Sequence, residues 1–499
     1  MAINLMRQSI ELEQLVGESA TQMQVKAEAL VPGAGREEAT VLLEDARVIV
    51  GSVEVQTDRV VLDGTLSCQA AYRMGEDSQV QSLGAQAAVS YVADIPGTGP
   101  RMAAQVQAAV EHVQADYENG RMVFTAVVAI RVRVNRLQPV ELIREIQGVE
   151  GLQTRVQDIC SVKTSAESGA TSMLRDQVTL PAALKASQAL MCRAQPEVTG
   201  SSPDLGGVRV SGNVQCELLI ASGVPGRPVA LVRYALPFDQ LVELPDWLSG
   251  EVSAQAQVRA MKAEVREGEE DEDGILDIEL ELDTTVQAGQ KEDLKVIYDL
   301  YTTGQGQLSP QLSPITLCTG FQHLNFAEPF KGTLLLPEGA PGVGTVLMVK
   351  LQPQLAQWSV QDGETVFEGV LEATVLYMPA GSDKAASVKS ELPFSVSGEG
   401  EVPQDAWVNI ECGEVEAAAL LSDRLELKAN LIISAAFCQN QTIQTVTEVE
   451  EQPAQPRRHG LVIVYPGSGD DGWSIAKRFT LPLDQVGEVH SGQPLVLRL

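Results

Sequence analysis

Apolar and polar residues alternate along three well-separated stretches of the chain. These stretches are VVLDGTLSCQAAY (60–72), VRVSGNVQCELLI (208–220) and TVFEGVLEATVLY (365–377). In each of them a glycine is followed by four apolar residues at every second position. A period of two places these side chains on one face of an extended chain, so each stretch is predicted to be a β-strand with one buried face.

The three stretches belong to an internal repeat. Their glycines are Gly64, Gly212 and Gly369. The proline of an apolar–Pro step precedes these glycines by 32, 31 and 32 residues, and a second such proline follows them by 32, 33 and 34 residues. Intervals kept this closely in three copies predict three homologous domains.

Each copy ends in a pattern typical of a β-hairpin. In the first copy, alternating runs at 106–117 and 122–134 flank Asn119 and Gly120, a pair that is common in tight hairpin turns. Comparable paired runs close the other copies, at 252–265 with 275–286 and at 408–420 with 425–437. The predicted fold is therefore mainly β, with three tandem homologous antiparallel domains of sandwich-like form.

The segments between the copies are predicted to be connectors. Residues 4–16 and 139–149 carry apolar residues at amphipathic helical spacing, and Pro139 occupies a helix-opening position. Segments 302–314 and 448–458 are poor in apolar residues and rich in turn formers. The predicted division, in chain order, is an N-terminal helix (1–20), β domain 1 (21–135), a helical linker (136–165), β domain 2 (166–288), a linker (289–324), β domain 3 (325–440), a linker (441–458) and a small C-terminal domain (459–499).

Composition excludes several classes of function. The 499 residues carry 36 Lys and Arg against 67 Asp and Glu, a formal net charge of −31, and no basic stripe, so nucleic-acid binding is not expected. The start of the chain lacks the apolar core of a signal peptide, and no stretch approaches the length of a membrane span. The seven cysteines are widely spaced without a CxxC motif, which favours reduced, mostly buried thiols in a reducing cytosol.

No residue set predicts an enzyme, a cofactor or a metal site. The four histidines, His112, His323, His459 and His490, have no metal-ligand spacing around them, and the sequence contains no GxSxG, HExxH or GxxxxGK(S/T) motif. The acidic run EVREGEEDEDG (264–274) lies at a predicted hairpin tip and lacks the alternating ligands of a calcium loop. A solvated turn is favoured there, and contact with a basic partner patch is the alternative.

The last 39 residues, LVIVYPGSGDDGWSIAKRFTLPLDQVGEVHSGQPLVLRL (461–499), show a different pattern. Strand, loop, two helices and strand follow one another, and the segment resembles a LysM domain, a small α+β (βααβ) module that binds N-acetylglucosamine-containing glycans. The matching pieces are 464–467, 473–479 and 492–495. The family's binding loops correspond here to 469–473 and 489–492, and Trp473 fits a core position as well as a binding position.

Residues 17–32, 60–72, 93–102 and 110–134 resemble the repeated domain of clostridial spore-coat morphogenetic proteins. Tandem repeats followed by one terminal LysM domain resemble the SipL (SpoIVA-interacting) family. This resemblance implies a non-enzymatic structural adaptor in the mother-cell cytoplasm at the forespore surface. It would bind the SpoIVA-like coat-basement scaffold ATPase and tether other coat proteins in coat layers. The alternative is a peptidoglycan-binding protein that acts through its LysM domain.

The candidate binding residues for a protein or glycan partner all lie in this C-terminal segment. They are Gly469, Asp470, Asp471, Gly472, Trp473, Lys477, Arg478, His490 and Gly492.

Overall fold

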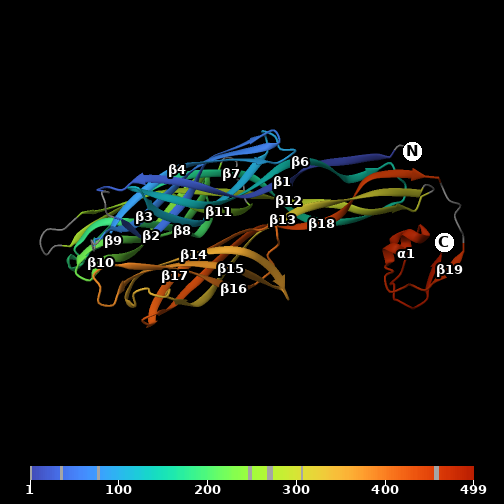
Figure 1. Ribbon diagram of the computed structural model, residues 1–499. Helices are drawn as coiled ribbons and strands as arrows, with labels where there is room; N and C mark the ends of the chain where they lie inside the picture. The colour runs from blue at the N-terminus through green and yellow to red at the C-terminus, as the bar shows by residue number, and fades with distance from the viewer. Residues whose placement is uncertain are drawn as a thin grey trace.

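A computed structural model describes residues 3–33, 38–75, 79–244, 250–266, 273–304, 307–453 and 460–498. Antiparallel β-strands make up most of this described part, which confirms the prediction of a mainly β protein. Three groups of six strands follow one another along the chain, and a small C-terminal module comes last (Figure 1). No helix among the described residues is long and apolar enough to cross a lipid bilayer.

The three groups have the same strand order. The first contains β1 (Asn4–Leu30), β2 (Ala39–Gln56), β3 (Arg59–Met74), β4 (Gln81–Asp94), β5 (Ala103–Glu118) and β6 (Arg121–Gln147). The second contains β7 (Leu152–Leu180), β8 (Ala186–Asp204), β9 (Gly207–Val224), β10 (Arg227–Glu243), β11 (Gly250–Arg266) and β12 (Gly274–Thr302). The third contains β13 (Gln307–Leu335), β14 (Val343–Gln361), β15 (Glu364–Pro379), β16 (Ala386–Glu399), β17 (Trp407–Leu421) and β18 (Arg424–Gln452). In each group one sheet has the order first–sixth–fifth and the other second–third–fourth.

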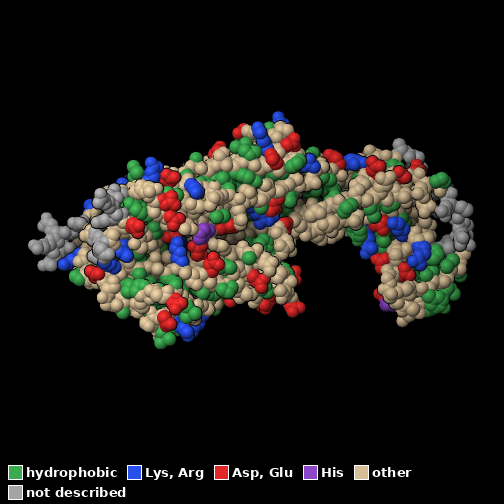
Figure 2. Space-filling view, in the orientation of Figure 1, with side chains coloured by type: hydrophobic (Ala, Val, Ile, Leu, Met, Phe, Trp, Pro, Cys, Tyr) green, Lys and Arg blue, Asp and Glu red, His purple; other side chains and the backbone are tan. Residues whose placement is uncertain are grey.

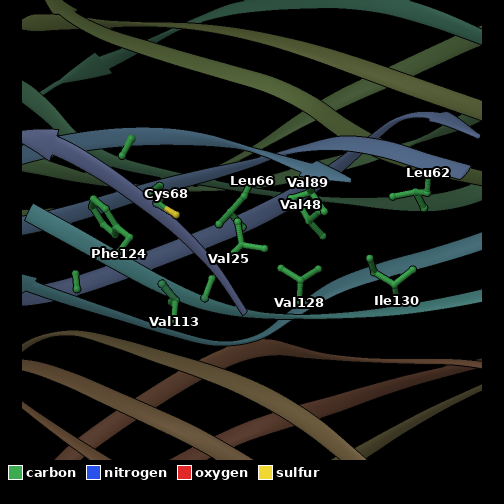
Figure 3. Packing of buried hydrophobic residues seen from close by; sticks show 14 of the residues in the cluster. Val25, Val48, Leu62, Leu66, Cys68, Val89, Val113, Phe124, Val128 and Ile130 are labelled. Atoms are coloured by element: carbon green, nitrogen blue, oxygen red, sulfur yellow. The ribbon is translucent and has the colours of Figure 1, made fainter. Parts of the chain in front are cut away.

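The two sheets of each group pack face to face as a sandwich around an apolar core. In the first sandwich, Leu66 and Cys68 of β3 pack with Phe124 and Val128 of β6 (Figure 3). The second and third sandwiches enclose equivalent cores. The inward residues of β3 are the alternating apolar residues of the repeat, so the period-two pattern was a correct guide to the buried face.

The repeat glycines occupy positions where the backbone of the neighbouring strand comes too close for a side chain. Gly64, Gly212 and Gly369 each pair with a residue next to a β-bulge in the preceding strand. A Cβ atom would lie 2.5 Å from a carbonyl oxygen at Gly64 and 2.1 Å from one at Gly212 and at Gly369. Steric contact across the bulge therefore explains why these positions hold glycine.

The paired runs at the end of each copy form the hairpins β5–β6, β11–β12 and β17–β18. The first hairpin turns at Asn119 and Gly120, which have φ values of 50° and 81°, as its sequence predicts. In the second, Arg266 and Asp277 form an ion pair at the base of the turn. Residues 267–272 of the acidic run lie outside the described residues, as does His459.

The long first and last strands of each group continue beyond the sandwich as a two-stranded ribbon. The paired segments are 4–15 with 135–147, 152–164 with 289–302, and 307–318 with 440–452. The three ribbons run side by side, away from the sandwiches, and share an apolar interior (Figure 1). We call this six-stranded bundle the stalk. Its interior contains Ile10 and Leu142 of the first ribbon, Leu294 of the second and Leu317 of the third.

The stalk overturns four of the predicted connectors. The helix predicted at 1–20 is part of β1, and the helical linker predicted at 136–165 consists mainly of the ends of β6 and β7. The linkers predicted at 289–324 and 441–458 are largely β12, β13 and β18. Pro139 is tolerated in a strand here because β6 beyond Asn135 pairs only with β1, so this part of β6 has one edge without a ladder partner.

The three sandwiches meet at a common apolar cluster to which all three contribute residues. Each contributes two adjacent residues at a β-bulge near the start of its second strand: Leu42 and Leu43, Leu190 and Met191, and Leu347 and Met348. A bulge turns both neighbours toward the same side, so each pair enters the cluster together. A small cavity next to the cluster is lined by charged residues from the same strands, among them Asp45, Arg193 and Lys350.

The C-terminal module contains β19 (Leu461–Val464), α1 (Gly472–Phe479), a 3-10 turn at Leu483–Gln485 and β20 (Leu495–Arg498). β19 and β20 form an antiparallel pair, and Ile475 and Ala476 of α1 are buried beneath it. The βααβ prediction is wrong in one respect, because the second helix is only this three-residue 3-10 turn. Pro482 begins the turn directly after Leu481, and the short connection leaves no room for a regular helix.

Candidate interaction surface on the C-terminal module

Helix α1 positions most of the candidate residues of the module. Its first turn is closed by a capping box, in which Ser474 N–H donates to Asp471 Oδ1 (2.8 Å) and Asp471 N–H donates to Ser474 Oγ (3.0 Å). The backbone hydrogen bond from Ser474 is the main reason that the pKa of Asp471 lies below its usual value. Asp471 is therefore a charged cap at the start of the helix.

Trp473 faces the stalk. Its side chain is almost completely buried, with 8 % of its surface exposed, and its ring packs edge-on against Tyr301 of β12 at a centroid distance of 5.0 Å. Its Nε1–H donates to Asp299 Oδ2 at 2.7 Å, and Lys477 Nζ donates to the other carboxylate oxygen at 2.5 Å. One carboxylate of the stalk thus binds an indole and an ammonium group from successive turns of α1.

Two further contacts complete this junction. Arg155 of β7 lies 3.1 Å from Asp471 Oδ2, with its guanidinium group over the rings of Tyr298 and Trp473. Tyr301 donates its hydroxyl to the carbonyl oxygen of Leu481 at 2.9 Å, and burial raises the pKa of Tyr301 above its usual value. The module is therefore held to the stalk by an aromatic contact, two charged pairs and a buried hydrogen bond.

The remaining candidate residues lie outside the junction. Arg478 Nη2 pairs with Asp470 Oδ1 at 2.9 Å, and Asp470 also accepts a hydrogen bond from the backbone of Gly467. His490 lies 3.6 Å from Glu488 on an exposed loop. Gly492 adopts a φ of 77°, and its N–H donates to the carbonyl oxygen of Pro466. Gly469 has no atoms near the position of a Cβ, and at Gly472 the nearest atom, of Leu483, is 3.8 Å away.

The structure thus divides the candidate set into two groups. Trp473, Asp471 and Lys477 contact the stalk, whereas Gly469, Arg478, His490 and Gly492 are exposed and Asp470 and Gly472 are half-buried. The core alternative for Trp473 agrees with its burial. For the second group, a role in binding stays a prediction.

Sequence reasoning did not identify Asp299, Tyr301 and Arg155 as residues of this surface. They lie in segments that were predicted to be connectors, more than 150 positions before α1 in the chain. No local motif marks them, because their common position arises only when β7 and β12 are placed in the stalk.

The outer face of the β19–β20 pair forms an exposed apolar patch on the module. It consists of Leu461, Ile463, Tyr465 and Val496, with exposed fractions of 73 %, 60 %, 68 % and 61 %. Ile463 and Val496 are direct cross-strand partners, and alternation places Leu461 and Tyr465 on the side of Ile463. Apolar side chains gather on the outward side of the module in Figure 2. A contiguous exposed cluster of this kind is typical of a protein-binding surface.

Within the described ranges, no group of three or more His, Cys, Asp or Glu residues is arranged to hold a metal ion. Charged side chains at the junction are bound to one another, as Asp299 with Lys477 and Arg155 with Asp471 show. The chemistry available on the module is therefore apolar contact through the β19–β20 face and hydrogen bonding through the exposed loops.

Comparison with known proteins gives one similarity. Residues 39–118 match the family model described as SipL, SPOCS domain, a segment that runs from the start of β2 to the end of β5. No curated protein and no solved structure gave a match. The matched segment includes the sheet β2–β3–β4 and the repeat glycine Gly64. Over residues 39–118, in its first sandwich, the chain is therefore similar to the SPOCS domain of SipL.

Proposed function

We propose that this protein is a non-enzymatic structural adaptor in bacterial endospore coat assembly. In this proposal it binds the SpoIVA-like scaffold ATPase of the coat basement and tethers further coat proteins, in the mother-cell cytoplasm at the forespore surface. The match of residues 39–118 to the SPOCS domain of SipL is the observation that carries the sporulation context. The exposed apolar patch on the C-terminal module supports a role in protein binding.

The proposal extends the SPOCS-like identity to all three sandwiches. The second and third share the strand order of the first, and their glycines Gly212 and Gly369 stand at the same bulge as Gly64. Tandem modules suit an adaptor, because linked weak contacts gain affinity through their high effective concentration. Three sandwiches and one module would present separate outer surfaces to different coat components.

We further propose that the C-terminal module, as a LysM-like domain, contacts the scaffold protein through Leu461, Ile463, Tyr465 and Val496. These side chains face away from the buried helix and expose more than half of their surface. The competing function is binding of peptidoglycan through the loops at 467–472 and 489–492. The hydrogen bond from Gly492 N–H to the carbonyl oxygen of Pro466, just before the first loop, brings the two loops together. Burial of the Trp473 ring against Tyr301 removes one aromatic surface on which a sugar ring would stack.

Co-purification from sporulating cells tests the proposal. Tagged full-length protein, a variant lacking 459–499 and the point variant Ile463→Asp are compared for recovery of the scaffold ATPase. Both variants are expected to recover much less of the scaffold ATPase than the full-length protein. The deletion removes the apolar patch, and in Ile463→Asp a carboxylate in the patch opposes apolar contact. The matched control is Leu205→Asp, since Leu205 is a highly exposed leucine on a turn of the second sandwich.

Sedimentation with insoluble peptidoglycan separates the two functions. The adaptor proposal predicts that full-length protein stays in the supernatant and that the Ile463→Asp variant stays there to the same extent. Sedimentation that is lost in the variant without 459–499, together with unchanged recovery of the ATPase by that variant, would contradict the proposal and favour the glycan-binding alternative.

A further inference from the structure

Two cysteines from opposite ends of the third group meet where its sandwich joins the stalk. Cys318 lies on β13 and Cys438 on β18, and these strands are paired along their whole length. Cys318 is opposite Asn440, and Cys438 is opposite Phe321. The register shifts between Cys318 and Gly320, so a β-bulge at Thr319 separates the two pairs.

The bulge brings the two thiols to the same face. On β18, Cys438 and Asn440 are two positions apart and therefore point to the same side. Because the bulge adds one residue to β13, Cys318 and Phe321 also share that side. Interaction with the Cys318 thiol is the main cause, ahead of burial, of a raised pKa at Cys438.

The two thiols are accessible to solvent, and a hydrogen bond orients the Cys318 thiol. Both side chains are partly exposed, in contrast to the buried Cys68 and Cys216 of the sandwich cores. The Cys318 thiol also donates to the carbonyl oxygen of Gly320 at 3.5 Å. When this proton leaves, the Cys318 sulfur is placed to accept a hydrogen bond from Cys438. A hydrogen bond of this kind stabilises the accepting sulfur as a thiolate.

From this geometry we infer that Cys318 and Cys438 form a site of oxidative modification, at which a peroxide converts the two thiols into an intramolecular disulfide. The Cys318 thiolate attacks one peroxide oxygen, the O–O bond breaks, and the leaving hydroxide takes up a proton as water. The Cys438 sulfur then attacks the resulting sulfenic acid, the S–O bond breaks, and a second water leaves with the Cys438 proton. The two thiols lose two electrons in total, and hydrogen peroxide gains them.

The bond would fix the third ribbon at its junction with the sandwich. Cys318 is joined through its carbonyl oxygen to Ser161 Oγ of β7 at 3.3 Å, so the same point also contacts the second ribbon. A disulfide between residues so far apart in sequence closes a long loop and restricts the unfolded chain strongly. Oxidation would therefore resist separation of β13 from β18 when load is placed on the stalk.

Peptide mapping of the oxidised full-length protein tests the inference. The protein is treated with hydrogen peroxide at about equimolar concentration, denatured, alkylated and digested without reductant. We expect a disulfide-linked peptide that contains Cys318 and Cys438, a fall from seven alkylated cysteines to five, and recovery of all seven after dithiothreitol. Separate peptides with both cysteines alkylated, or Cys318 joined to a different cysteine, would overturn the inference.

Two variants give a matched comparison. Cys160→Ser removes the exposed cysteine of β7 and is expected to leave the linked peptide unchanged. Cys438→Ser should abolish it and leave Cys318 as a sulfenic acid that dimedone traps. Oxidation is also expected to raise the melting temperature of the wild type by about 5 °C, an increase that Cys438→Ser lacks. An equal rise in the melting temperature of Cys438→Ser would contradict the assignment. If this variant fails to fold, the peptide map of the oxidised wild type still tests the inference by itself.

Discussion

Lys350 Nζ lies 2.7 Å from Asp45 Oδ1, and this ion pair joins the third sandwich to the first beside their shared apolar cluster. The two residues occupy equivalent positions, each two residues beyond the second member of a bulge pair, and Arg193 is the third equivalent. Three identical residues here would bring three like charges together. One carboxylate and two cations instead make the arrangement attractive, so the three sandwiches are not interchangeable at this point.

Substitution of Lys350 tests the importance of this ion pair. Lys350 is buried, and it also donates to the carbonyl oxygen of Glu44 at 2.8 Å. Lys350→Met leaves the Asp45 carboxylate without its closest cation, and we expect the unfolding free energy to fall by about 3–5 kcal/mol, as is typical when one partner of a buried pair is removed. Urea denaturation followed by circular dichroism measures the change.

The matched control for Lys350→Met is Arg121→Met, which removes the exposed pair between Arg121 and Glu28. A loss of about 0.2–1 kcal/mol is expected for it, because water screens both charges. Equal effects of the two substitutions would show that the pair at the cluster adds nothing beyond a surface contact.

The same carboxylate predicts a dependence of stability on acid pH. Burial alone raises the pKa of Asp45, but the charges of Lys350 and Arg193 outweigh it and hold this pKa below its usual value. The stabilisation is therefore fully present above the pKa of an unfolded aspartate, about 3.9, and is lost as the pH falls through the lower folded value. Thermal melts between pH 5 and pH 2 should show a shallower loss of stability in Asp45→Asn than in the wild type.

A substitution at a repeat glycine tests the steric explanation of the repeat. In Gly369→Ala the new methyl group would lie 2.1 Å from the carbonyl oxygen of Gln354 and 2.7 Å from the Phe394 ring. The strands must separate at the bulge, and we expect a loss of about 1–3 kcal/mol in unfolding free energy. Gly99→Ala is the control, because nothing lies near its Cβ position. A neutral effect at Gly369 would mean that the bulge relaxes freely.

The sequence revealed those parts of the fold that are determined by local alternation. The strands that contain Gly64, Gly212 and Gly369 and the three hairpins agree with the structure, because one face of each is buried within its own sandwich. The paired apolar residues at the bulges, such as Leu42 and Leu43, break the alternation. These adjacent apolar residues are the sequence signal that marks the common cluster.

The stalk was missed for a different physical reason. Ile10 and Leu142 are buried by residues of the other two ribbons, and such partners leave no periodic trace in the segment itself. The apolar residues of 4–16 fit a helix as easily as a strand when the partner is unknown. The docking of Trp473 on Asp299 could not be predicted for the same reason, since it requires the stalk to be in place first.

The last prediction concerns that docking. In Asp299→Asn the carboxylate that binds both Trp473 Nε1 and Lys477 Nζ becomes a neutral amide, and the ion pair to Lys477 is lost. We expect α1 to detach from the stalk more often, so that the backbone amides of 472–479 exchange hydrogen for deuterium at least threefold faster. The exposed Glu488→Gln in the same module is the control and should leave this exchange unchanged. Equal exchange in both variants would indicate that the charge of Asp299 is dispensable and that the other junction contacts hold the module, namely the ring contact of Trp473 with Tyr301, the pair of Arg155 with Asp471 and the hydrogen bond from Tyr301 to Leu481.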